Sequence, residues 1–340
     1  MPNNRGAETP IVDLVTGATS GIGRGLVQLL LNEGHEVRAL LRQSPTTSDE
    51  WMRLPPNVKL YVADLRSGEE PEMQVMMDAC RGIDNLFHLA GAVYNYKHTF
   101  NDLIESNVVA TDNLLSACQE ANRQSGKAVH VIFASSESVY GYNRPGETLT
   151  EESELRPAGA YSESKEMAER VVESYAETDP KMNYTILRLG RLYGPHYRDS
   201  FFKVFKLIKE GRAMYVGSGD NHLTLMHEND AVRLMYLVSQ NPKSLNKIYN
   251  AADGVPYTAK ELFSIVAEYF KVKPPKHHIP RTVAKIVRPI NNITSDEMEF
   301  LASDRIVSID KVRSELGFVP KEKMTKAGIE MLKLFEESHK

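Results

Sequence analysis

The chain has 340 residues, with 41 lysines and arginines against 45 aspartates and glutamates and a formal net charge of −4. Both signs are mixed along the whole length, which excludes the basic patch of a nucleic-acid-binding protein. With 41% apolar and 25% charged residues, the composition is that of a globular protein rather than a disordered one. The sequence contains neither an apolar run of roughly 20 residues nor a signal peptide at its start. We therefore expect a cytoplasmic protein without a membrane partner.

Strands and helices are predicted to alternate through the first 195 residues. The predicted strands cover residues 11–16, 36–41, 58–62, 85–89, 129–134 and 184–189. The predicted helices cover residues 22–32, a stretch ending near residue 80, about 101–121 and 161–177. Alternation of this kind is typical of right-handed βαβ units. We therefore expect an α/β fold of Rossmann type, with a doubly wound parallel sheet.

After residue 195 the predicted elements become less regular. Helices are expected over residues 200–210, 229–238, 258–270, 310–316 and 325–335, with short strands near 214–216 and 248–250. This pattern indicates a smaller, discontinuous C-terminal substrate lobe. We predict a Rossmann domain of residues 10–195 plus about 222–252, and a substrate-binding lobe of about 196–221 and 253–340.

A glycine-rich turn lies between the first predicted strand and the first predicted helix. Without side chains, the backbone there can turn tightly, approach a pyrophosphate and direct the N–H groups at the helix start toward it. The strand before the turn and the helix after it are the context that this motif requires. The turn therefore predicts a dinucleotide site, whose candidate residues are Gly17, Thr19, Ser20, Gly21, Ile22 and Gly23.

The end of the second predicted strand bears on the choice between NAD and NADP. An acidic residue at that place typically holds the ribose hydroxyls of NAD, whereas this strand ends in Leu41 and Arg42. The Arg42 guanidinium suits a 2′-phosphate, and Arg38 is a second candidate. NADP is therefore favoured and NAD stays open. Asp64, after the third strand, is a candidate acceptor for the adenine amino group.

Tyr161 and Lys165 are four residues apart, which places them on one face of a helix. A cation within about 4–6 Å can lower the pKa of a tyrosine by about 1–3 units from its usual value near 10, which makes a phenolate usable as a base. Ser135 and Ser136 follow the strand predicted at 129–134, at the sheet edge where open α/β sheets bind their ligands. The three segments together predict a site for proton transfer.

Taken in order, the motifs resemble the extended branch of the short-chain dehydrogenase/reductase superfamily, the NAD-dependent epimerase/dehydratase family. The matching segments are the glycine turn, residues 88–91, Asn107, and residues 135–141, 161–165 and 187–195. This resemblance implies a homodimer and a dinucleotide that also contacts Leu65, Leu89, Ala90, Gly91 and Lys165.

The same resemblance implies catalytic roles. Tyr161 would be the general base, Lys165 would lower the pKa of Tyr161 and hold the nicotinamide ribose, and Ser136 would bind the reacting oxygen. Asn107 would support the active-site helix or a bound water. The implied substrate-binding residues are Ser136, Glu137, Tyr161 and Arg191.

Several departures from the family pattern bear on the substrate. Dehydratases place an acid/base pair after the active-site serine or threonine, and here Glu137 is followed by Ser138, which disfavours dehydration. Leu223 stands where nucleotide-sugar enzymes usually carry an arginine for the diphosphate, and Arg191 replaces a usual asparagine. Arg191 therefore has two open interpretations, a phosphate contact or a salt bridge between lobes.

The leading hypothesis is an NAD(P)-dependent epimerase acting through a transient ketone on a sugar, and the resemblance implies a nucleotide sugar. The alternative is an NADPH-dependent carbonyl reductase resembling dihydroflavonol reductases and 3β-hydroxysteroid dehydrogenases, which Arg42 and Leu223 favour. A third class, a non-catalytic cofactor-sensing protein, is disfavoured because Tyr161, Lys165 and Ser136 are all present.

Two pairs of histidines and two tyrosines are further candidates for a functional site. The histidine pairs 277/278 and 222/227 lack acids or cysteines at ligand-like spacing, so no metal site is predicted. Tyr94 and Tyr96 follow the fourth predicted strand and are candidates either for the pocket lining or for a solvent-facing loop.

Overall fold

The computed structural model describes residues 10–43, 54–92, 99–280, 283 and 301–338. Its centre is a seven-stranded sheet of order β12-β7-β5-β4-β1-β2-β3, in which every neighbouring pair is parallel. This topology confirms the predicted Rossmann-type fold. The strands are β1 (Val12–Thr16), β2 (Glu36–Leu41), β3 (Lys59–Val62), β4 (Asn85–His88), β5 (Val129–Ser136), β7 (Met182–Leu189) and β12 (Lys247–Ala251).

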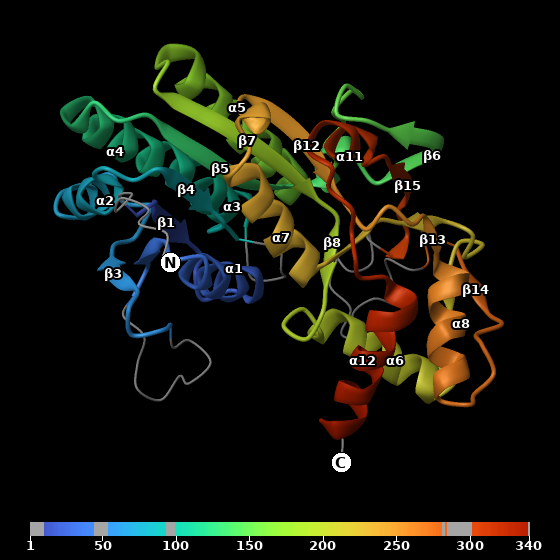
Figure 1. The fold of residues 1–340 in the computed structure, drawn as a ribbon. Coiled ribbons are helices and arrows are strands. Elements are labelled where there is room, and N and C mark those ends of the chain that lie inside the picture. Colours follow the sequence, from blue (N-terminus) through green and yellow to red (C-terminus); the bar gives the residue numbers. More distant parts are fainter. Residues whose placement is uncertain (1–9, 44–53, 93–98, 281–282, 284–300, 339–340) are drawn as a thin grey trace.

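Helices cover both faces of this sheet because successive strand residues point to opposite sides. Val15 packs in one core with α1 (Gly21–Asn32), α7 (Glu228–Ser239) and α11 (Asp310–Leu316). Its neighbour Leu14 packs in the other core, with α2 (Glu72–Cys80), α4 (Ala110–Ser125) and α5 (Ala160–Thr178). Figure 1 shows these layers around the sheet. The carboxyl ends of the strands are therefore held between two packed helical layers.

The helix predicted over about 101–121 is interrupted. It consists of α3 (Phe100–Ile104), a π-helical turn (Glu105–Val109) and α4. Single π turns inside helices frequently occur at functional sites. This one carries Asn107, whose side chain is buried.

A second helical cluster lies beyond β8 (Arg191–Tyr193) and is drawn in yellow-green, orange and red in Figure 1. In it, α6 (Asp199–Lys209), α8 (Ala259–Tyr269) and α12 (Met324–Glu337) share one apolar core. The short strands of this region are β9 (Tyr215–Val216), β10 (His222–Leu223), β11 (Leu225–His227), β13 (Tyr257–Thr258) and β14 (His278–Ile279). A 3₁₀ turn, Pro242–Ser244, lies between α7 and β12 and accepts a hydrogen bond from Thr185 in β7. The domain boundaries drawn from the sequence stay a prediction.

Two paired strands beside the sheet were missed by the sequence analysis. β6 (Asn143–Leu149) pairs in parallel with β15 (Asp304–Val307). Pro145 and Gly146 inside β6 are turn residues rather than strand residues, so the local pattern gives no strand signal. The pairing brings Arg305 to the 3₁₀ turn Glu137–Tyr140 that follows β5. Among the described residues, no helix is long and apolar enough to cross a membrane.

Candidate functional site

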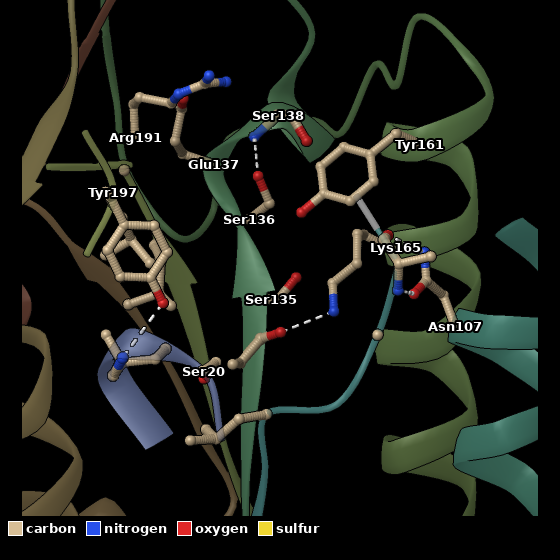
Figure 2. A pocket seen from close by; sticks show the side chains of 18 of the residues that line it. Ser20, Asn107, Ser135, Ser136, Glu137, Ser138, Tyr161, Lys165, Arg191 and Tyr197 are labelled. Carbon is tan, nitrogen blue, oxygen red and sulfur yellow. Dashed lines mark hydrogen bonds between the residues drawn. The ribbon is translucent and has the colours of Figure 1, made fainter. Parts of the chain in front are cut away.

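A cavity of about 550 Å³ opens at the carboxyl ends of the central strands. Its walls come from the start of α1, the segments after β4 and β5, the start of α5, and the chain after β7 (Figure 2). Chain segments far apart in the sequence thus meet at one sheet edge, which is where open α/β sheets bind ligands. The predicted residues that line it are Ser20, Ile22, Leu89, Ala90, Gly91, Asn107, Ser136, Glu137, Tyr161, Lys165 and Arg191.

The glycine turn has the close backbone approach that the motif predicts. Gly17 has a φ of +65°, and a Cβ on it would lie 2.9 Å from the Ala90 nitrogen. A Cβ on Gly23 would lie 2.2 Å from the Gly17 carbonyl oxygen. Ser20 caps α1, because its hydroxyl accepts a hydrogen bond from the Gly23 N–H at 3.1 Å. The turn therefore brings the start of α1 to the cavity edge, and the start of a helix is the kind of place that binds a pyrophosphate. Thr19 lies within this turn but does not line the cavity.

Tyr197 lies at the start of α1 and was missed by the sequence analysis. Its hydroxyl oxygen accepts a hydrogen bond from the Ile22 N–H at 3.2 Å (Figure 2), and a Cβ on Gly21 would lie 2.8 Å from its ring. Burial raises the pKa of this phenol. The Tyr197 hydroxyl thus accepts a hydrogen bond from the Ile22 N–H. Backbone N–H groups at the start of a helix are the donors that bind phosphate oxygens. It follows the turn at Gly194, and nothing in its local sequence distinguishes it from a surface tyrosine.

The loop after β4 is fixed by a buried polar chain. The Thr16 hydroxyl accepts hydrogen bonds from the Leu89 and Ala90 N–H groups at 3.2 and 3.1 Å. His88 lies between the hydroxyls of Thr16 and Thr111, at 2.8 and 2.9 Å. Burial lowers the pKa of His88 to about 3, so its imidazole is neutral at physiological pH. The contacts hold residues 89–91 beside the glycine turn.

Asn107 connects this loop to the active-site helix. Its side-chain oxygen accepts from the Ala92 N–H at 2.8 Å, and its amide donates to the Ala92 carbonyl at 3.0 Å and to the Ser164 hydroxyl at 2.9 Å. Ser164 lies in α5, next to Lys165. Of the two predicted roles for Asn107, these contacts favour support of the helix.

Tyr161, Lys165 and Ser136 meet in the cavity. Figure 2 shows the Tyr161 ring directed into the space between Ser136 and Lys165. The Ser136 hydroxyl accepts a hydrogen bond from the Ser138 N–H at 3.2 Å. Ser135 also lines the cavity, but its hydroxyl donates to the buried Glu169 carboxylate. Ser136 is therefore the serine that the geometry offers to a ligand.

Lys165 is buried, and its charge is poorly solvated. Its ammonium donates to the Ala134 carbonyl at 2.7 Å and lies 4.2 Å from the centre of the Phe133 ring. Burial lowers the pKa of Lys165 to about 8, and the Glu169 carboxylate partly counters this effect. Lys165 therefore stays mostly protonated near neutral pH. A cation next to a tyrosine lowers the pKa of the phenol.

Glu137 was predicted as a substrate-binding residue, and its carboxylate is already engaged. Arg305 in β15 forms a buried ion pair with it, donating from Nη2 to Oε1 at 2.5 Å, and donates from Nη1 to the Gly141 carbonyl at 2.6 Å. Both side chains are almost fully buried. Glu137 thus lines the cavity as half of an ion pair. Arg305 is a site residue that the sequence analysis missed, since only the β6–β15 pairing brings it there.

Arg191 and Leu223 have different surroundings. The Arg191 side chain lines the cavity, and its Nη2 donates to the Ser200 hydroxyl at 2.9 Å. Leu223 is 1% exposed and packs in the apolar core of the second cluster. Leu223, which stands where the resemblance implies an arginine, is therefore apolar and buried, and Arg191 places a cation in the cavity wall.

The residues predicted around the adenosine lie at the ends of β2 and β3, outside the main cavity. Arg42 is exposed, whereas the Arg38 guanidinium donates to the Ala79 and Arg81 carbonyls, which favours Arg42 of the two candidates. Asp64 pairs with Arg66, whose hydrogen bonds are the main reason that the Asp64 pKa is lowered. Leu65, directly after Asp64, has no contact that distinguishes a cofactor role. Tyr94 and Tyr96 lie outside the described residues.

The histidines weighed for metal binding have other surroundings. His222 pairs with Asp304 at 3.0 Å, His227 caps α7, and His278 contacts the Gly217 carbonyl at 3.0 Å. Across the part of the chain that the structure describes, no group of three or more His, Cys, Asp and Glu side chains could hold a metal ion.

Comparison with known proteins identifies the family. The model of the NAD dependent epimerase/dehydratase family matches residues 14–252. The chain belongs to this family. It is thus an enzyme of the short-chain dehydrogenase/reductase type, as its motifs predict.

The curated relatives include both kinds of enzyme that the sequence left open. An N-acetyl-alpha-D-glucosaminyl-diphospho-ditrans,octacis-undecaprenol 4-epimerase from Escherichia coli O157:H7 is 26% identical over 63% of this chain and 62% of that protein. A 2-alkyl-3-oxoalkanoate reductase from Stenotrophomonas maltophilia is 26% identical over 73% of this chain and 72% of that protein. Among solved structures, MoeE5 in complex with UDP-glucuronic acid and NAD is 25% identical, with a TM-score of 0.73 over 96% of this chain and 99% of that one.

Proposed function

We propose that this enzyme carries out reversible oxidation of a secondary alcohol to a ketone, with Tyr161 as the proton-transferring residue. The observation that supports this most directly is the meeting of Tyr161, Lys165 and Ser136 in the cavity that also borders the glycine turn. Tyr161 and Lys165 lie on successive turns of α5, and Ser136 lies at the end of β5. Together the three side chains supply a base, a cation and a hydroxyl.

Proton transfer follows from this arrangement. With the Lys165 cation in the same cavity, Tyr161 takes the proton from a substrate hydroxyl. Ser136 holds the same oxygen by a hydrogen bond, and Asn107 keeps α5 in place through Ser164. A bound nicotinamide dinucleotide supplies the acceptor for the hydride that leaves the carbinol carbon. When the reaction runs in reverse, Tyr161 returns the proton to the ketone oxygen.

NADP is the dinucleotide that this proposal favours over NAD. Arg42 is exposed at the end of β2, where the adenosine ribose lies in this type of fold, and Asp64 at the end of β3 is paired with Arg66. A free guanidinium at this place binds a 2′-phosphate, whereas a free carboxylate would favour the ribose hydroxyls of NAD. The solved relative MoeE5 was determined with NAD. Titration of this enzyme with NADP and with NAD therefore tests the preference for NADP.

The first candidate reaction is epimerisation of a nucleotide-linked sugar. Its support is Arg191, a cation that lines the same cavity as Tyr161 and suits a substrate phosphate, and the UDP-sugar bound to MoeE5. Epimerisation needs the intermediate ketone to turn within the cavity and to accept the hydride on its other face. Dehydration is disfavoured because Arg305 engages Glu137 and Ser138 is neither an acid nor a base.

The second candidate is a carbonyl reductase, which a specific observation favours. Leu223 lies in an apolar wall at the position where a diphosphate-binding arginine is usual in sugar-nucleotide enzymes. A charged diphosphate gains nothing from that wall. A ketone with an apolar substituent would use it.

Mass spectrometry of what co-purifies with the enzyme separates the two candidates. A dinucleotide retained through purification supports an epimerase, which reuses its cofactor within each turnover. An empty site that binds NADPH reversibly in calorimetry supports a reductase, which exchanges its cofactor. A protein that neither retains nor binds either dinucleotide would contradict the proposed chemistry.

A further inference from the structure

A second, smaller cavity adjoins the candidate active site. It measures about 40 Å³ and lies in the apolar core of the second cluster, between α6, α8 and the start of α12. Arg191 and Ser200 line both cavities, so the smaller one begins where the larger one ends. The other described residues of its lining are hydrophobic and include Val204, Leu223 and Phe263.

The chemistry of the smaller cavity selects its occupant. Among the described residues, Arg191 and Ser200 are the only hydrogen-bonding side chains in its lining, so water away from these two finds no partner among the described side chains. Leu223 is 1% exposed, Phe205 2% and Met324 3%. A hydrocarbon group would gain dispersion contacts there without displacing bound water. The volume sets the size, since an apolar cavity of about 150 Å³ is known to hold benzene, and this one has room only for a short chain.

We propose that this cavity is a substrate subsite. It would bind a short aliphatic group that is attached to the reacting carbon of the substrate. The proposal rests on the proposed hydride transfer at Tyr161. The substrate would place its carbinol or ketone oxygen at Ser136 and Tyr161, pass Arg191, and bury its alkyl end between α6 and α8. The Arg191–Ser200 hydrogen bond lies at the passage between the two cavities.

The test is a series of methyl ketones from 2-butanone to 2-octanone, assayed with NADPH and with NADH. Each methylene buried in the subsite contributes about 0.8 kcal/mol, which is about fourfold in kcat/KM. We expect kcat/KM to rise by about this factor per added carbon and then to level off once the cavity is full.

Variants of Val204 show whether the cavity causes this dependence. Val204→Phe fills the space, so the ratio of kcat/KM between the longer and the shorter ketones should fall to about one. Val204→Ala enlarges the space and should move the plateau to a longer chain. The matched control is Leu207→Phe, one helical turn further along α6, because Leu207 packs on the same core without lining the cavity. It should leave the ratio unchanged, and melting temperatures show that each variant folds.

A binding measurement separates failure of the subsite from failure of the proposed function. Saturation-transfer NMR reports contact between protein methyl groups and the alkyl end of each ketone, and it works equally on Tyr161→Phe, which does not turn over. Turnover with a kcat/KM that does not depend on the chain length of the ketone would overturn the proposed subsite but would not contradict the proposed function. Chain-dependent NMR contact that Val204→Phe removes, without turnover in the wild type, would support the subsite and count against ketone reduction. Absence of both would overturn the subsite.

Discussion

Lys165 holds a positive charge at a buried position, and we expect Lys165→Met to stabilise the fold while it abolishes activity. Burial lowers the lysine pKa from 10.5 to about 8. At about 1.4 kcal/mol per pKa unit, keeping the cation in the folded protein at pH 7 costs about 3 kcal/mol. Methionine also loses the hydrogen bond to Ala134 and the contact with Phe133, which together offset about 1–2 kcal/mol. The expected net gain at pH 7 is about 1–2 kcal/mol.

The dependence on pH identifies the cause of this gain. Between about pH 8 and pH 10.5 the folded protein holds Lys165 neutral, whereas the unfolded chain still binds the proton. Unfolding then takes up a proton, so wild-type stability rises with pH in this window and is lowest below pH 8. The advantage of Lys165→Met is therefore largest at neutral pH and shrinks as the pH rises above 8.

Thermal unfolding at pH 7.0 and pH 9.5 measures both effects. For a chain of this length, about 1 kcal/mol corresponds to roughly 1–2 °C in Tm. Lys165→Met should melt about 1–4 °C above the wild type at pH 7.0, and the difference should vanish or reverse at pH 9.5. Lys181→Met, at an exposed position after α5, is the matched control and should shift Tm by less than about 1 °C. A lower Tm for Lys165→Met at pH 7.0, or a difference that ignores pH, would refute the reasoning.

Three further predictions concern the cofactor and the substrate. Arg42→Ala should weaken NADP binding about 10–100-fold, because a charge-assisted contact contributes about 1.5–3 kcal/mol, and it should change NAD binding little. The loss of NADP affinity should be smaller at high salt. Equal losses for both dinucleotides in calorimetry would exclude the role of Arg42. Tyr197→Phe should tighten NADP binding about 2–10-fold, because the phenol hydroxyl no longer occupies the Ile22 N–H; weaker binding would mean that the hydroxyl itself contacts the cofactor. No 4-keto-6-deoxy product should form from UDP-glucose, because Arg305 engages Glu137; its detection by chromatography and mass spectrometry would disprove this.

The fold could be predicted because its signals are local. Short apolar runs such as residues 129–134 and the helical spacing of apolar residues after the glycine turn reflect burial on one or both faces. The glycines themselves are required by close backbone contacts, as the Gly23–Gly17 approach shows. Tyr161 and Lys165 could be placed together because one helical turn separates them.

The rest depends on contacts between distant segments. Arg305 reaches Glu137 across a strand pairing that Pro145 and Gly146 conceal, so its place in the site could not be predicted from its neighbours. Tyr197 reaches Ile22 across 175 positions of sequence. The family resemblance already pointed to Ser136 rather than Ser135, and the hydrogen bond from Ser135 to Glu169 supplies a physical reason for that choice. The homodimer and the domain boundaries stay predictions.

The central claim is that Tyr161 assists hydride transfer in this cavity, and stopped-flow absorbance at 340 nm tests it most directly. The enzyme is saturated with NADP or NAD, in the oxidised or the reduced form. It is then mixed with UDP-glucose, UDP-glucuronic acid, 2-hexanol or 2-hexanone. Reduction or oxidation of the nicotinamide is then visible both for an epimerase and for a reductase. We predict that at least one compound changes the absorbance, and that Tyr161→Phe slows this step about 10²–10⁴-fold without loss of dinucleotide binding. An absorbance change that proceeds at the wild-type rate in Tyr161→Phe would contradict the account.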